Sequence, residues 1–155
     1  MAGPASISLF LPSEEDTARL AAHLAPRLDA GDVILLFGPI GAGKTHFARA
    51  LIRARLQNPA EDVPSPSFTL VQTYEGAPDI WHADLYRLGH PDEVLELGLE
   101  AAFAEAICVI EWPDRLGRFL PDESLKLTFA NEGEGRRLTA TGPDRLLALL
   151  EGFHS

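Results

Sequence analysis

The chain has 155 residues, of which 46% are hydrophobic and 23% charged, proportions that fit one soluble globular domain and exclude a disordered or collagen-like chain. Thirteen Lys and Arg residues against 23 Asp and Glu residues give a formal net charge of −10. A field of this sign repels nucleic-acid backbones and anionic membranes, so we expect no direct tight nucleic-acid binding. A single cysteine, Cys108, excludes an internal disulfide and a multi-cysteine zinc site.

The sequence shows no export or membrane-anchoring signal. Met1–Ala5 lacks a basic region, and the longest apolar runs, such as Val33–Phe37, are far shorter than the roughly 20 residues that span a bilayer. The single cysteine makes the reducing cytosol the default compartment. We therefore expect a cytoplasmic protein without a membrane partner, in which residues 1–155 form a single domain.

The first elements along the chain are a strand, a helix and a second strand. Ser6–Leu11 alternates polar and apolar side chains, which predicts a short strand. Ser13 and Asp16 form a capping-box-like pair at the start of a helix predicted over residues 13–29. Val33–Phe37 is a continuous, partly β-branched apolar run, typical of a parallel strand that is buried on both faces.

A glycine-rich turn and a second helix follow the buried strand. Apolar residues at helical spacing predict this helix over residues 44–56. Three prolines, Pro59, Pro64 and Pro66, then predict an exposed loop over residues 57–67.

The rest of the chain predicts mainly short strands, at Phe68–Tyr74, Ile80–Ala83, Ile107–Ile110, Leu125–Ala130 and Arg136–Thr141. An amphipathic region, Glu93–Glu105, precedes the third of these strands, and a terminal helix is expected to reach about Phe153. A five-residue loop, Asn131–Gly135, joins the last two strands as a hairpin. The order of elements predicts an α/β fold, in which helices flank a mostly parallel central sheet with an antiparallel hairpin near the C-terminus.

The turn between the buried strand and the second helix matches the phosphate-binding pattern G-x-x-x-x-G-K-[ST], with Gly38, Pro39, Ile40, Gly41, Ala42, Gly43, Lys44 and Thr45. Glycines let successive backbone N–H groups converge on phosphate oxygens, and the helix N-terminus adds its positive dipole end. Lys44 can reach the β- and γ-phosphates, and Thr45 can give its hydroxyl to Mg²⁺. With His46, the next residue, this segment predicts a P-loop NTPase-like site for ATP and Mg²⁺.

A site for a magnesium nucleotide also needs a carboxylate at the end of a nearby strand. Glu111 follows the apolar residues of Ile107–Ile110, as in a Walker B strand with glutamate in place of aspartate. Asp84 follows Ile80–Ala83, a strand that His82 interrupts. Each acid could also be a solvated residue at a strand end, and we expect at least one of them to be functional.

Other polar and aromatic residues near these motifs allow two interpretations. Ser65, Ser67 and Thr69 resemble a segment that orders around a γ-phosphate, although an ordinary loop has the same composition. For His82 and the tryptophans Trp81 and Trp112, a buried side chain is favoured over a ligand. Cys108 lies inside an apolar strand and is expected to be inert core.

Five segments, taken in order and spacing, resemble the TsaE-type ATPases of bacterial tRNA threonylcarbamoyladenosine biosynthesis: Gly38–Thr45, Ser65–Val71, His82–Leu88, Glu96–Leu99 and Glu111–Pro113. The resemblance covers about Ser13 to Thr141. It implies a small cytoplasmic ATPase that binds the heterodimer of TsaB and TsaD, of which TsaD transfers threonylcarbamoyl to adenosine 37 of tRNAs that read ANN codons. ATP would be used to reset that complex between turnovers.

The resemblance also implies roles for single residues. Lys44 and Thr45 would bind phosphate and Mg²⁺, with Lys44 also catalytic, and the loop around Ser67 would act as a switch that contacts the nucleotide. Glu111 would bind the metal, and Asp84 would act directly in catalysis or support a residue that does. Two positions depart from the family pattern: Ser67 replaces a usual threonine and keeps the hydroxyl, and Pro39 replaces a common acid.

Two rival functions remain open. A small-molecule P-loop kinase would need a lid that supplies several arginines, and the nearest pair in the sequence, Arg115 and Arg118, follows Glu111-Trp112-Pro113. A nucleotide-dependent interaction module would bind ATP without significant hydrolysis. Because the sequence shows no obvious arginine finger or water-orienting glutamine, we expect slow hydrolysis until a partner completes the site.

Overall fold

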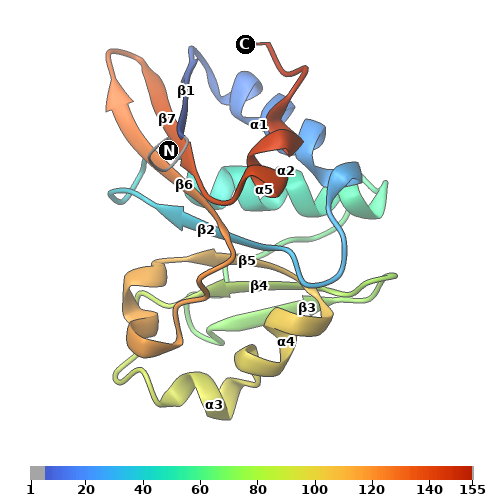
Figure 1. Cartoon of the computed structure of the whole chain (residues 1–155), viewed down its shortest axis with the longest axis vertical. Helices are drawn as coiled ribbons and strands as arrows, with labels where there is room; N and C mark the ends of the chain where they lie inside the picture. The colour runs from blue at the N-terminus through green and yellow to red at the C-terminus, as the bar shows by residue number, and fades with distance from the viewer. Residues whose placement is uncertain (1–5, 155) are drawn as a thin grey trace.

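A seven-stranded mixed sheet organises the computed structural model, which describes residues 6–154 (Figure 1). The strand order is β1-β7-β6-β2-β5-β4-β3. The strands are β1 (Ser6–Leu11), β2 (Val33–Phe37), β3 (Val71–Tyr74), β4 (Ile80–Asp84), β5 (Ile107–Glu111), β6 (Leu125–Glu132) and β7 (Gly135–Thr141). The α-helices are α1 (Glu14–Leu24), α2 (Lys44–Leu56), α3 (Glu93–Leu97), α4 (Leu99–Glu105) and α5 (Asp144–Leu147). The predicted α/β class is confirmed.

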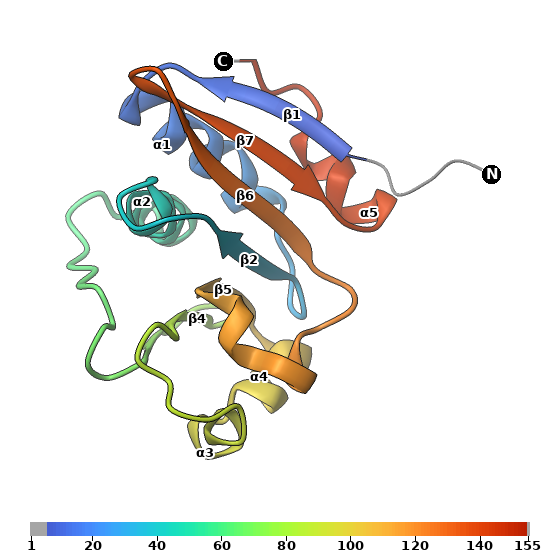
Figure 2. The ribbon, with the colours of Figure 1, turned by 90° about the vertical axis from the view of Figure 1, so that its left-hand side faces the viewer.

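Parallel pairing is confined to the centre of the sheet. β6, β2, β5 and β4 are neighbours and run parallel, whereas β1, β7 and β6 pair antiparallel at one edge and β4 and β3 at the other. The predicted C-terminal hairpin is present as β6 and β7, and Figure 2 shows it beside β2. Antiparallel strands therefore flank the four central parallel strands on both sides.

Two hydrophobic cores lie on opposite faces of the sheet. Ile34 and Leu36 of β2 pack with α1, α2 and α5, whereas Val33 and Leu35 pack with α3 and α4. Successive side chains of a strand point to opposite faces, so a run with apolar residues at every position supplies both cores. This burial on both faces was predicted from the apolar run.

The first helix is shorter than predicted. Its capping box between Ser13 and Asp16 is present, but α1 ends at Leu24 and a 3₁₀ turn, Ala25–Arg27, follows. Pro26 has no N–H to continue the α-helical hydrogen bonds, and its ring crowds the carbonyl one turn earlier. The predicted extension to residue 29 is therefore wrong.

The ends of several later elements also differ from prediction. The five-residue hairpin loop is wrong, because Glu132 pairs with Gly135 and leaves a two-residue turn in which Gly133 takes a positive φ of 58°. β3 begins only at Val71, after Leu70 with a φ of 68°. The terminal helix is a single short α-helix, α5, followed by the 3₁₀ turn Ala148–Leu150.

Of the two sequence observations that concern a membrane, only one involves residues that the structure describes. Over residues 6–154, every helix is too short or too polar to cross a membrane. The expectation for Met1–Ala5 concerns residues outside the described range.

Candidate nucleotide-binding site

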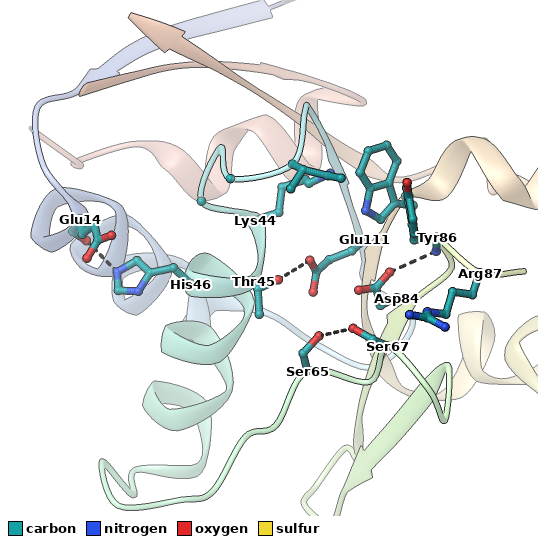
Figure 3. Close-up of a pocket in the computed structure, with 14 residues that line it drawn as sticks. Glu14, Lys44, Thr45, His46, Ser65, Ser67, Asp84, Tyr86, Arg87 and Glu111 are labelled. Carbon is teal, nitrogen blue, oxygen red and sulfur yellow. Dashed lines mark hydrogen bonds between the residues drawn. The ribbon is translucent and has the colours of Figure 1, made fainter. Parts of the chain in front are cut away.

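A cavity of about 450 Å³ opens where β2, β4 and β5 end at the same edge of the sheet (Figure 3). It brings together most of the residues singled out in the sequence, and its walls are formed by Glu14, Ile40, Gly41, Gly43, Lys44, Thr45, His46, Ser65, Ser67, Asp84, Tyr86, Arg87, Glu111 and Trp112. Gly38, Pro39 and Ala42 belong to the same loop but do not line the cavity. Ala42 is instead fully buried in the core that α1 and α2 share.

The glycines of the loop meet two different physical requirements. Gly41 and Gly43 have positive φ angles of 81° and 103°, and the space where a Cβ would stand is open at both. The loop can therefore approach a ligand closely with its backbone. Gly38 has a φ of 138°, and a Cβ there would lie 2.6 Å from the carbonyl oxygen of Phe129 in β6. The first glycine thus packs the loop against the sheet.

Lys44 opens α2 and extends back across the loop. Its Nζ donates a hydrogen bond to the carbonyl of Gly38 and lies 3.5 Å from the ring centroid of Trp112. Burial lowers the pKa of Lys44, and the negative charges of Glu111 and Asp84 oppose that shift. A largely desolvated ammonium at the base of a glycine-rich loop is suited to binding phosphate oxygens.

Thr45, Glu111 and His82 form a chain of hydrogen bonds at the floor of the cavity. The Thr45 hydroxyl donates to Glu111 Oε1 at 2.6 Å, and His82 Nε2 lies 2.7 Å from Glu111 Oε2. Glu111 is 2% exposed and His82 is fully buried. A hydroxyl oxygen and a carboxylate oxygen side by side are both suitable ligands for Mg²⁺.

The protein groups offered to a metal are few. Within residues 6–154, no set of three or more His, Cys, Asp or Glu side chains is arranged to hold a metal ion. Mg²⁺ is commonly held by one or two protein groups together with phosphate oxygens and water. The Thr45 and Glu111 pair fits that kind of site.

Asp84 and Glu111 lie side by side, because they are register partners at the ends of the parallel strands β4 and β5. Asp84 accepts a hydrogen bond from the backbone N–H of Tyr86. Burial raises the pKa of Asp84, the Tyr86 N–H opposes this shift, and the charge of Glu111 adds to it. A carboxylate with a raised pKa is suited to accept a proton.

The proline-rich loop contributes two serines to the cavity. Ser65 Oγ and Ser67 Oγ are 2.9 Å apart and hydrogen-bonded (Figure 3). The third hydroxyl, that of Thr69, lies outside the lining and accepts a hydrogen bond from the Gln72 amide. Phe68, the next residue after Ser67, is 83% exposed.

Four residues at or beside the site were not singled out from the sequence: Glu14, Tyr86 and Arg87 line the cavity, and Arg136 contacts the phosphate loop. The Arg87 guanidinium lies 4.6 Å from the ring centroid of Phe68. The sequence shows no obvious arginine finger near the phosphate and metal residues, whereas the structure places Arg87 at the cavity wall. Arg87 could have been found by its position, since it follows the strand-end acid Asp84 by three residues.

Arg136 comes from β7, and nothing in its local sequence indicates its role. Its guanidinium donates to the carbonyls of Gly41 and Ala42, both at 3.1 Å, from outside the loop. Carbonyls held outward leave the N–H side of the loop free to face the cavity. The other two arginines that were considered do not line the cavity: Arg118 pairs with Asp92, and Arg115 lies over the ring of Tyr86, which does line it.

Two further expectations concern His46 and Cys108. His46 lines the cavity, while its Nε2 hydrogen-bonds the carbonyl of Glu14 at 2.9 Å and so ties α2 to the start of α1. Cys108 is fully buried in β5, and burial raises the pKa of its thiol to about 12. A thiol in this state is inert, as predicted.

Comparisons with known proteins agree with this geometry. The family model described as "Threonylcarbamoyl adenosine biosynthesis protein TsaE" matches residues 11–139. The "tRNA threonylcarbamoyladenosine biosynthesis protein TsaE" of Rickettsia felis is 38% identical over 131 residues, which cover 84% of this chain and 76% of that protein. The protein of the same name from Aquifex aeolicus is 42% identical over 109 residues, which cover 69% of this chain and 77% of that protein.

A solved structure extends the likeness to the whole fold. The crystal structure of YdiB from Bacillus subtilis matches with a TM-score of 0.75 and 26% sequence identity, and the match covers 97% of this chain and 95% of that chain. The family match runs from the end of β1 into β7 and includes the phosphate loop, both strand-end acids and Arg136. The chain therefore belongs to the TsaE family.

Proposed function

We propose that the chain is an ATPase that acts in tRNA threonylcarbamoyladenosine biosynthesis, with ATP and Mg²⁺ as its cofactors. The observation that carries this proposal is the hydrogen bond between Thr45 and Glu111 beneath the phosphate loop, which sets a hydroxyl and a carboxylate side by side at the cavity floor. Membership of the family supports the biosynthetic role.

The residues divide the work of hydrolysis among them. The N–H groups of the loop and the Lys44 ammonium bind and orient the phosphates, and Thr45 and Glu111 would hold Mg²⁺. The bound metal would neutralise charge on the phosphate oxygens. Asp84, whose pKa is raised by burial, orients the attacking water and accepts its proton at the carboxylate. Arg87 lies at the cavity wall, where its positive charge stabilises the negative charge of the transferred phosphoryl group.

The partner in this proposal is a complex of the TsaB–TsaD type, which the ATPase resets between turnovers in the cytoplasm. Ile40, which lines the cavity, is 73% exposed, and Phe68, which follows the lining residue Ser67, is 83% exposed. Apolar side chains in such positions are suited to a protein surface. The net charge of −10 is unfavourable for gripping tRNA directly.

The nucleotide site is tested by thermal unfolding with and without Mg-ADP. A ligand at 100 times its dissociation constant adds about 2.7 kcal/mol to stability, which raises the Tm of a chain of this size by about 5–10 °C. Lys44→Ala is expected to lose most of this rise, because it removes the ammonium at the base of the loop. Lys126→Ala, which changes the other lysine of the chain, is the matched control and should keep the full rise. An undiminished rise in Lys44→Ala would overturn the assignment of the phosphate loop.

A further inference from the structure

His82 is a buried polar residue that the proposed mechanism does not use. It lies on β4, two residues before Asp84, so both side chains point to the same face of the sheet. Asp84 is the register partner of Glu111, and His82 is the register partner of Val109. His82 is therefore the diagonal neighbour of Glu111, one step deeper in the sheet.

The carboxylate of Glu111 is held at both of its oxygens. Thr45 donates to Oε1 at 2.6 Å, and His82 Nε2 lies 2.7 Å from Oε2. Two partners on different oxygens remove the freedom of the carboxylate to rotate about its terminal bond. The oxygen nearest the phosphate loop is therefore selected by the contact on the other oxygen.

The surroundings of the His82 ring decide which nitrogen carries the proton. Nδ1 is buried and has no hydrogen-bond partner among the described residues. A proton on Nδ1 would leave a buried N–H unpaired and would turn the Nε2 lone pair toward a carboxylate. The ring therefore carries a proton on Nε2, which it donates to Glu111.

A purely structural residue at this position would not need these properties. Ile80, on the same face of β4, and Val109, level with His82, are both fully buried and apolar. An aliphatic side chain in place of His82 would continue this packing without burying an unpaired ring nitrogen. The imidazole leaves one buried nitrogen unpaired, and what it provides instead is the hydrogen bond to Glu111.

We propose that His82 is a positioning residue for the metal site: by donating from Nε2 to Glu111 Oε2, it holds Oε1 toward Thr45 and the cavity, where the pair would receive Mg²⁺. This inference rests on the proposed function. Outer hydrogen-bond partners of metal ligands commonly change metal affinity by about 10–100-fold when they are removed.

The test is the affinity for ADP, measured by calorimetry over a range of Mg²⁺ concentrations and in EDTA. His82→Leu is expected to raise the Mg²⁺ concentration for half-maximal binding by about tenfold or more, in the same direction as Glu111→Gln. The affinity in EDTA should stay within about twofold of wild type, because the loop and Lys44 are unchanged. Ile80→Ala is the control, since it creates a cavity on the same face of β4 and should lower the Tm without changing the Mg²⁺ dependence.

Two polar variants keep the test decisive if His82→Leu does not fold. A glutamine amide reaches the place of Nε2 and restores a donor, whereas an asparagine amide reaches only the place of Nδ1. His82→Gln should therefore need a Mg²⁺ concentration for half-maximal binding close to that of wild type. His82→Asn should need a higher one, as His82→Leu does. Equal Mg²⁺ dependence in both variants, or an equal loss of affinity with and without Mg²⁺, would overturn the positioning role.

The outcomes separate this inference from the proposed function. Mg²⁺-dependent binding that disappears in Lys44→Ala and persists unchanged in His82→Leu overturns only the role of His82. Wild-type binding that is indifferent to Mg²⁺, or to Lys44→Ala, overturns the proposed site and the inference together.

Discussion

Asp84 and Glu111 are two buried acids that stand next to each other at the ends of neighbouring strands. Burial raises the pKa of Asp84, and the like charge of Glu111 adds to this shift. A residue of this kind lowers the stability of the folded protein but is retained because it contributes to activity. Its replacement should therefore change stability and activity in opposite directions.

Asp84→Asn is expected to raise the Tm of the nucleotide-free protein at pH 7. Because the folded state raises the pKa of Asp84 above its ordinary value of 3.8, the folded state binds the proton more tightly than the unfolded chain. Wild-type stability therefore falls as the pH rises from about 4 through the raised pKa, and the variant escapes this loss. The gain in Tm should shrink toward pH 4 in a pH series of unfolding curves.

The same variant should bind Mg-ADP and turn over ATP about 10²-fold more slowly, because it loses a proton acceptor. Asp62→Asn, in the exposed part of the proline-rich loop, is the control and should change neither Mg-ADP binding nor ATP turnover. A variant less stable than wild type at pH 7 would show that the Asp84 carboxylate is favourably ionised.

The site residues that could be predicted from the sequence are those with local signals. The phosphate loop, Thr45 and the two strand-end acids follow from the run of strand, glycine turn and helix. His82 was assigned to the core because a lone histidine in an apolar strand carries no local sign of its partner. Its bond to Glu111 exists only because β4 and β5 are neighbours in register.

At the scale of elements, the hairpin of β6 and β7 supports the phosphate loop from outside. Gly38 packs against the Phe129 backbone of β6, and Arg136 of β7 holds the carbonyls of Gly41 and Ala42. The strands and the helix over residues 44–56 could be predicted from hydrophobic periodicity. The support from the hairpin could not, since residues more than 90 positions apart meet only in the folded sheet.

Arg136→Ala is expected to weaken Mg-ADP binding by about tenfold, equivalent to about 1.4 kcal/mol, because the loop carbonyls lose charge-assisted hydrogen bonds. Arg137→Ala is the matched control, because the neighbouring side chain pairs with Glu132 at the surface and such pairs contribute little. Calorimetric titration of both variants checks the prediction. An equal loss in the two variants would assign the effect to overall charge.

At the scale of the whole molecule, the cavity combines residues from the phosphate loop, the proline-rich loop and the strand ends. Arg87 lies at its wall with its guanidinium over Phe68, a side chain that is almost fully exposed. A partner that covers Phe68 would also fix Arg87. Occupancy of the cavity and affinity for the partner are then linked reciprocally.

We expect slow ATP turnover by the protein alone and faster turnover after addition of a TsaB–TsaD complex. Phe68→Ala should reduce this stimulation severalfold while leaving ADP affinity within about twofold, because the ring contacts Arg87 and does not itself line the cavity. Leu95→Ala, which changes an exposed apolar residue of α3 outside the cavity lining, is the control. Fast turnover alone, or no response to the complex, would favour a kinase or a binding module without hydrolysis.

The position of β2 in the sheet has a consequence for protein synthesis. β2 ends at Phe37, but its neighbours β5 and β6 end only at Glu111 and Glu132. A chain that leaves the ribosome N-terminus first therefore carries the complete glycine-rich motif long before it has the acid at the cavity floor or the hairpin behind the loop. On the proposed site, we expect Mg-nucleotide to bind fully only when most of the chain has been made, so that the ligand stabilises finished molecules more than truncated ones.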